Sequence, residues 1–160
     1  MRMRGHGVHS PFAYRFITEV IGEPGRTYAY YAYPAIRSLA LKYGEQEHWL
    51  RLLFRVTAEF FPADILVDSQ LTPAERKVIT MASPRGYFRL PPATTAAMSV
   101  LADLPEGLQH RGTVIIKDIR RPGWSEWLDE DACSMVFTDS HQAIVVSRPD
   151  FSHQVFTVKF

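Results

Sequence analysis

The chain has little of what would identify a secreted or membrane-spanning protein. It has 160 residues and one cysteine, Cys133, so no disulfide forms within it and a reducing compartment is expected. No apolar run approaches the ~18 residues that a membrane-spanning helix needs. The basic start MRMRGHGVHSPF lacks the apolar stretch of a secretory signal. These absences predict a cytoplasmic protein without a membrane segment.

Neither sign of charge is in excess. There are 18 Lys and Arg residues and 17 Asp and Glu residues, for a net charge of +1. This balance provides no drive toward nucleic acid or acidic membranes, and no nucleic-acid motif, zinc spacing or phosphate-binding loop is found. A hydrophobic content of 46% with 22% charged residues is typical of a globular domain, so we expect a single domain over 1–160.

Helical spacing dominates residues 1–62, which we expect to form a helical amino-terminal region. Ser10 suits the N-cap of a first helix, and Pro11 suits its first position, because that position needs no backbone N–H. Apolar residues then recur at helical spacing. The expected helices span 10–21, 33–43 and 45–61.

From residue 63 onward, short apolar runs alternate with helical patterns. Strands are expected over 64–68, 86–90, 112–118, 134–140, 142–148 and 153–160. Helices are expected over 72–82, 94–104 and 124–131. The first of these begins with a capping box, formed by Thr72 and Glu75, with Pro73 at its first position. The alternation predicts an α/β core over 63–160, with a mostly parallel sheet and an antiparallel edge.

The opening stretch GHGVHSPFAYRFITEVI (5–21) resembles the amino terminus of a bacterial group of methyltransferase-like proteins, typical of Bacteroidetes. Those proteins begin with H-G-[VI]-H-S-P-F on a leading helix. Further matches follow in order: YYAY (30–33), LLFR (52–55), ILV (65–67), TVIIKDIR (113–120) and VFTVKF (155–160). The resemblance implies a class I S-adenosylmethionine-dependent methyltransferase fold, a three-layer Rossmann-like arrangement with strand order 3-2-1-4-5-7-6.

The chain departs from that family where the cofactor binds. The family's first strand runs into a glycine-rich turn, because a side chain would block the cofactor, yet residues 64–84 contain no glycine. We find no strand to match the family's second, whose last acidic residue holds the ribose, nor its third. Strand 86–90 is interpreted as the fourth; Leu90, Pro91 and Pro92 follow it and offer no metal ligand.

The resemblance therefore implies a shortened sheet of order 1-4-5-7-6. In this interpretation strand 64–68 becomes an edge with unpaired backbone groups. We expect a dimer partner, a leading helix or the terminal strand 153–160 to cover it.

Candidate site residues follow the strands. Three of them lie after the first strand, where ligands bind in parallel sheets, and are vestigial cofactor-binding candidates: Asp68, Ser69 and Gln70. Their structural alternative is to satisfy the turn. Asp118 is a vestigial catalytic candidate, the remainder of an acidic pair that relatives often carry. Its alternative is a local ion pair with Arg120 or Arg121.

A second group of candidates could form a partner or substrate surface: His9, Tyr28, Tyr30, Tyr31 and Tyr33. The alternative is a loop folded over the core. His6 and His9 are three apart but lack a third ligand nearby, so no metal is expected and His9 is assigned to capping the first helix. Cys133 is interpreted as structural.

Two functions from different classes are left open. The first is a binding or assembly module that has lost S-adenosylmethionine binding and catalysis and uses no cofactor. It would act as a homodimer through the strand 64–68 edge or the amino-terminal helices. The alternative is an active, compact O-methyltransferase that uses S-adenosylmethionine on a small molecule. A filled carboxyl edge of the sheet favours the module, and a deep pocket with a free carboxylate favours the enzyme. A folded remnant without activity is a third reading.

Overall fold

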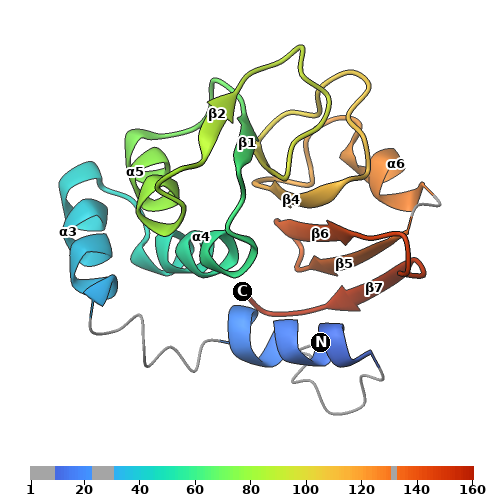
Figure 1. The fold of residues 1–160 in the computed structure, drawn as a ribbon, viewed down its shortest axis with the longest axis horizontal. Coiled ribbons are helices and arrows are strands. Elements are labelled where there is room, and N and C mark those ends of the chain that lie inside the picture. Colours follow the sequence, from blue (N-terminus) through green and yellow to red (C-terminus); the bar gives the residue numbers. More distant parts are fainter. Residues whose placement is uncertain (1–9, 23–30, 131–132) are drawn as a thin grey trace. The chain divides into compact units, whose positions relative to one another are not determined.

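Figure 1 shows the computed structural model of the chain, in which residues 10–22, 31–130 and 133–160 are described. The chain divides into two compact units. A helical unit includes residues 3–61 and 72–85, and a sheet unit includes 62–71 and 86–159. Within the described ranges, no helix combines the length and the apolar character needed to span a bilayer.

The helical unit contains the helices expected at the start of the chain and the capped helix that follows the first strand. They are α1 (Pro11–Arg15), which continues into the π-helix η1 (Phe16–Ile21), α3 (Tyr33–Tyr43), α4 (Glu47–Phe60) and α5 (Pro73–Ala82). The predicted N-cap is confirmed, because the Ser10 hydroxyl accepts a hydrogen bond from the Ala13 N–H at 3.2 Å. Local signals thus place these helices close to their predicted bounds.

Side-chain hydrogen bonds fasten the start of α5 to α4 and to the chain before it. The capping box is present: the Glu75 N–H donates to the Thr72 hydroxyl at 3.1 Å, and the Thr72 N–H donates to the Glu75 carboxylate at 2.9 Å. The Thr72 hydroxyl donates to Glu45 at 2.9 Å, and the Trp49 indole donates to Glu75 at 2.7 Å. The buried Glu75 therefore serves the cap and the packing of the two helices at once.

A buried arginine closes the end of η1. Arg55 of α4 is 2% exposed, and its guanidinium donates to the carbonyl oxygens of Val20 at 2.6 Å and Ile21 at 3.3 Å. It also donates to the Tyr33 hydroxyl at 3.2 Å. The last carbonyls of a helix lack partners within it, so a cation at this position satisfies them and favours the helix dipole.

The sheet unit is a seven-stranded mixed sheet with the order β2-β1-β3-β4-β6-β5-β7. The strands are β1 (Asp64–Val67), β2 (Tyr87–Arg89), β3 (Met98–Leu101), β4 (Gly112–Ile116), β5 (Ser134–Thr138), β6 (Ala143–Ser147) and β7 (Gln154–Thr157). Strands β1 to β4 run parallel, β6 is antiparallel to its neighbours β4 and β5, and β7 is parallel to β5. The mixed α/β class expected from the sequence is therefore present.

The helix predicted over 94–104 is wrong. Residues Met98–Leu101 form β3, which pairs in parallel with β1 on one side and β4 on the other. All four of its residues are buried. The segment is rich in Ala, Met and Leu, which favour helices, but two ladders of backbone hydrogen bonds and burial of both faces outweigh that weak preference.

The prediction that strand 64–68 forms a sheet edge is also wrong. Ile65 pairs with Phe88 of β2 and with Met98 of β3, so both sides of β1 are occupied within the chain. The predicted order 1-4-5-7-6 fails for the same reason, because strand 86–90 lies outside β1 and β3 lies inside it. A dimer through the β1 edge is thereby excluded; one through the amino-terminal helices stays a prediction.

One face of the sheet packs against the short helix α6 (Trp124–Asp129). Leu66, Leu101 and Val114 point to this face and form one buried cluster with Trp124 and Trp127. The two indole rings meet edge to face, with centroids 5.6 Å apart. Each indole N–H donates to a backbone carbonyl at 3.0 Å, so these large side chains are buried without an unpaired donor.

Candidate functional site at the carboxyl ends of the strands

The candidate residues that follow β1 and β4 meet at one edge of the sheet unit. Because β1, β3 and β4 are parallel neighbours, the segments 68–71, 102–105 and 117–121 all leave the sheet on the same side. Ligands of open α/β sheets bind at this side. The side chains here therefore decide what the edge can bind.

Asp68 is bound to the backbone of two segments. One carboxylate oxygen accepts the Gln70 N–H at 3.0 Å, which closes a local turn. The other accepts the N–H groups of Ala102 at 2.9 Å and Asp103 at 3.1 Å, just past the end of β3. The contact with Gln70 agrees with the structural alternative, in which Asp68 satisfies the turn. The contacts with Ala102 and Asp103 go beyond it, because they cap the end of the neighbouring strand.

The other two candidates after β1 lie on the surface of the same turn. Ser69 and Gln70 are both exposed. The Gln70 carbonyl oxygen accepts a hydrogen bond from the Lys117 ammonium at 2.9 Å. Lys117 follows β4, so this hydrogen bond joins the end of β4 to the turn after β1.

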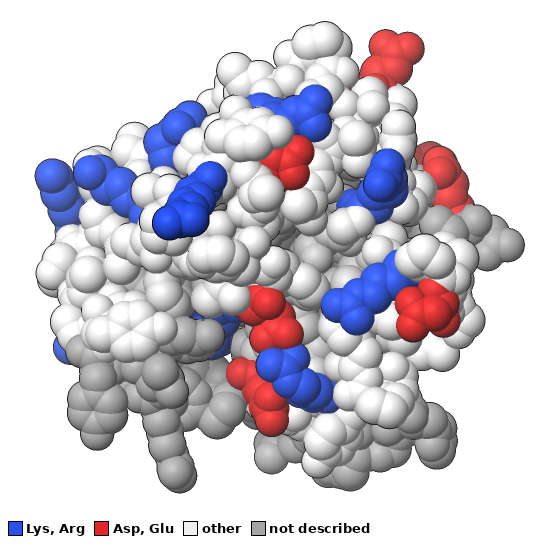
Figure 2. Space-filling view, in the orientation of Figure 1, with Lys and Arg blue, Asp and Glu red and all other residues white. Residues whose placement is uncertain are grey.

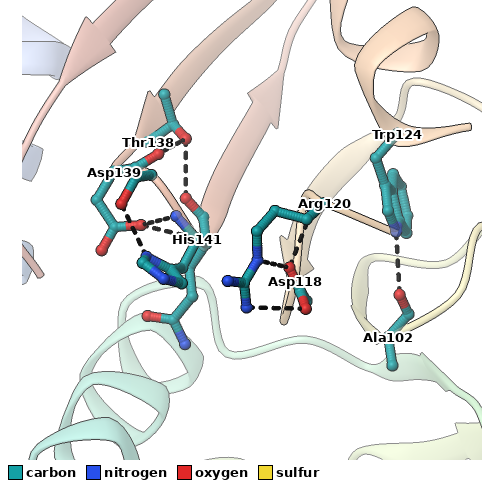
Figure 3. A network of polar contacts seen from close by, with 9 residues as sticks. Ala102, Asp118, Arg120, Trp124, Thr138, Asp139 and His141 are labelled. Atoms are coloured by element: carbon teal, nitrogen blue, oxygen red, sulfur yellow. Dashed lines mark hydrogen bonds and ion pairs between the residues drawn. The ribbon is translucent and has the colours of Figure 1, made fainter. Parts of the chain in front are cut away.

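Asp118 forms a bidentate ion pair with Arg120, as drawn in Figure 3. The two side-chain contacts measure 2.8 and 3.2 Å, and the Arg120 N–H adds a third at 3.0 Å. The hydrogen bonds from Arg120, helped by its charge and that of Arg121, lower the pKa of the Asp118 carboxyl below its ordinary value of 3.8. Arg121 itself pairs with Asp103 at 2.8 Å.

The turn between β5 and β6 reaches the same edge, and sequence reasoning did not identify it as part of the site. One Asp139 oxygen accepts the N–H groups of His141 and Gln142, both at 2.7 Å. The Ile119 N–H donates to the His141 carbonyl at 2.7 Å, which ties this turn to the chain after β4. Figure 3 shows His141 beside Asp139, with the Asp118–Arg120 pair close by. The signal in the sequence is TDSHQ, a cluster of turn-forming residues between two strands.

At this edge of the sheet, four carboxylates already have hydrogen-bond partners within the chain. The carboxylates of Asp68, Asp103, Asp118 and Asp139 all accept hydrogen bonds from backbone N–H groups or arginines. In the part of the chain that the structure describes, no three His, Cys, Asp or Glu residues gather so as to hold a metal ion. The arrangement fits a set of structural caps better than general acid–base chemistry, which needs a carboxyl in reach of a substrate.

The predicted tyrosine surface is only partly described. Tyr31 is 62% exposed, but Tyr33 is 5% exposed and its hydroxyl contacts Arg55, so it belongs to the core of the helical unit. The guanidinium of Arg51 lies 4.2 Å from the Tyr33 ring centroid. The other residues of the predicted surface, His9, Tyr28 and Tyr30, lie outside the described residues, and so does His6. Cys133 is exposed.

Comparison of the chain with protein-family models finds no match, and comparison with curated proteins finds none either.

Proposed function

We propose that the protein is a binding or assembly module built on a methyltransferase-like sheet that does not bind S-adenosylmethionine. The observation that carries this proposal is the Asp68 carboxylate, which accepts three backbone N–H groups at the point where the cofactor of such a fold would lie. A side chain held in this way closes the approach that a glycine turn would leave open.

The strand order supports the relationship to methyltransferases. The family order 3-2-1-4-5-7-6 contains the run 2-1-4-5-7-6. The observed run β2-β1-β3-β4-β6-β5 can be matched to it strand by strand, with the antiparallel β6 in the place of the family's strand 7. In this correspondence strand 86–90 takes the place of the second strand, not the fourth. The direct link 90–97 stands where the family has its third strand, and β7 extends the other edge.

The residues around this edge supply few cofactor contacts. The second strand of the family ends in an acid that binds ribose hydroxyls, but β2 is followed by Leu90, Pro91 and Pro92. A micromolar affinity requires about 8 kcal/mol of binding free energy. With the glycine turn and the ribose acid both replaced, and with Asp68 committed to the backbone, the main sources of that energy are missing.

The alternative function, a compact O-methyltransferase, has one observation in its favour. The sheet has more strands than the sequence indicated, and β2 pairs with β1 on the side where the cofactor's ribose lies in the methyltransferase fold. An enzyme would still need Asp68 or Asp118 to leave its present partners when substrate binds.

Titration with S-adenosylhomocysteine separates the two functions. We expect no heat at about 100 µM protein, a concentration at which a micromolar site gives a saturable signal. A second readout is the melting temperature, which rises in excess ligand if the folded state binds it. Heat of binding with a matching rise in melting temperature refutes the proposed module and supports the methyltransferase.

A further inference from the structure

The helical unit carries an open groove that none of the functions above uses. It lies between α3 and α5, holds about 780 Å³, and is lined by residues of these two helices. The lining residues of α3 fall within 35–42 and those of α5 within 73–81. On each helix they recur every three or four residues, so each helix presents one continuous face to the groove.

The floor of the groove is apolar and open to solvent. Ala35 and Leu39 of α3 face Met81 of α5, which is 37% exposed. The core of the unit uses the opposite faces of the same helices, where Ile36 and Val78 are fully buried. The groove is therefore a second apolar face of each helix, one that the fold of the unit does not consume.

The rim of the groove is basic. Lys42, Arg76 and Lys77 line it, and none of the described residues that line it is acidic. Figure 2 shows Lys and Arg side chains over the region where α3 and α5 lie in Figure 1, with no Asp or Glu side chain among them on that face. A chain whose charges balance overall thus concentrates one sign around its open apolar groove.

We propose that this groove docks an acidic, amphipathic α-helix of a partner protein. Apolar residues of that helix would cover the floor between Leu39 and Met81, and Glu or Asp residues on its flanks would pair with Lys42, Arg76 and Lys77. The lined stretches, 35–42 and 73–81, are eight and nine residues long, or about 12–14 Å, which matches two to three turns of a docked helix. The inference rests on the proposed function, since it gives the binding module its partner.

The charge on the rim argues against a second copy of the chain. Two copies docked face to face through this groove would oppose the same three cations. The open shape argues against a lipid, because an acyl chain in an open groove keeps much of its surface in water, whereas a helix covers the groove with its own width.

The test uses three labelled peptides of about 16 residues, long enough for helix formation on binding. All share one Leu stripe at helical spacing, and their other positions are mainly Glu, Gln or Lys. Fluorescence anisotropy with the full chain is expected to rank their affinities as Glu above Gln above Lys, with the advantage of the Glu peptide falling as salt is added. The double variant K42E/K77E is expected to weaken binding of the Glu peptide several-fold and by up to about 25-fold, since each of two exposed ion pairs contributes up to about fivefold.

A control is Lys159→Glu, which makes the same charge change as either single substitution, at an exposed position of the sheet unit, and should leave the affinity unchanged. Equal binding of all three peptides, or full binding by the double variant, overturns the proposal. The proposal is also overturned if the chain binds vesicles of anionic phospholipid but not the Glu peptide. It is likewise overturned if the chain associates with itself and K42E/K77E abolishes this association. If the Glu peptide does not bind and the titration with S-adenosylhomocysteine gives no heat, only the proposed docking groove is refuted. If the Glu peptide binds and the titration does give heat, only the proposed loss of cofactor binding is refuted.

Discussion

Replacing Asp68 with alanine should destabilise the protein by about 2–3 kcal/mol. The carboxylate accepts three backbone N–H groups, and a hydrogen bond to a charged group contributes about 1.5–3 kcal/mol when buried. The N–H groups of Gln70 and Asp103 belong to exposed residues and can bond to water instead, so their loss is small. The N–H of the buried Ala102 is left without its acceptor, and we assign most of the effect to it.

Urea unfolding followed by tryptophan fluorescence measures this loss, because Trp124 lies in the core of the sheet unit. With a dependence of about 1–3 kcal/mol per molar urea, the midpoint should fall by about 1–2 M. Asp68→Asn keeps one carboxamide oxygen and should lose about half as much, and Ser69→Ala at the neighbouring exposed position should change little. A midpoint for Asp68→Ala within about 0.3 M of the unchanged protein would refute the assignment of Asp68 as a structural cap.

Three further predictions concern residues elsewhere in the chain. Arg55→Met should cost about 3 kcal/mol in urea unfolding, because two carbonyls at the end of η1 lose a buried charged donor. Gly112→Ala should lower the melting temperature far more than Gly44→Ala: both residues have positive φ, but only at Gly112 would the new methyl group collide with a backbone carbonyl. The carboxyl of Asp118 should titrate by NMR below 3.8, and Arg120→Ala should return it toward 3.8. Because folding lowers this pKa, the pair stabilises the protein above pH 3.8 and that stabilisation fades as pH falls through the lower value.

The helices could be predicted from the sequence because their signals are local. Ser10 followed by Pro11, and Thr72 with Glu75, form caps within four residues, and the structure contains both. The strand β3 could not be predicted in this way. Its helix-favouring composition is overruled by pairing with β1, some 33 residues earlier, and with β4. Such pairing leaves no mark in the segment itself.

Part of the site could be predicted from the sequence. The contacts that could not be predicted join residues that are far apart in the sequence. The position of Asp68 at the end of a strand and its role in a turn follow from neighbouring residues. Its main partners lie 34 and 35 residues later, after β3, a segment whose composition predicts a helix. The order of the strands depended on the same segment: without β3, the prediction places strand 86–90 between β1 and β4, whereas it pairs with β1 on the other, outer side.

The contacts of Asp68 also explain how the proposed loss of cofactor is compatible with a stable sheet. At the carboxyl ends of parallel strands, backbone N–H groups point away from the last paired residues and need an acceptor. In a methyltransferase that binds its cofactor at this edge, the bound ligand and water can fill that need, whereas in this chain the Asp68 carboxylate accepts the N–H groups of Ala102 and Asp103. Introducing glycines at positions 69 and 70 alone should therefore not restore binding, because the carboxylate that closes the edge would remain. Only removal of that carboxylate would open it, and the same change removes the cap that stabilises the end of β3.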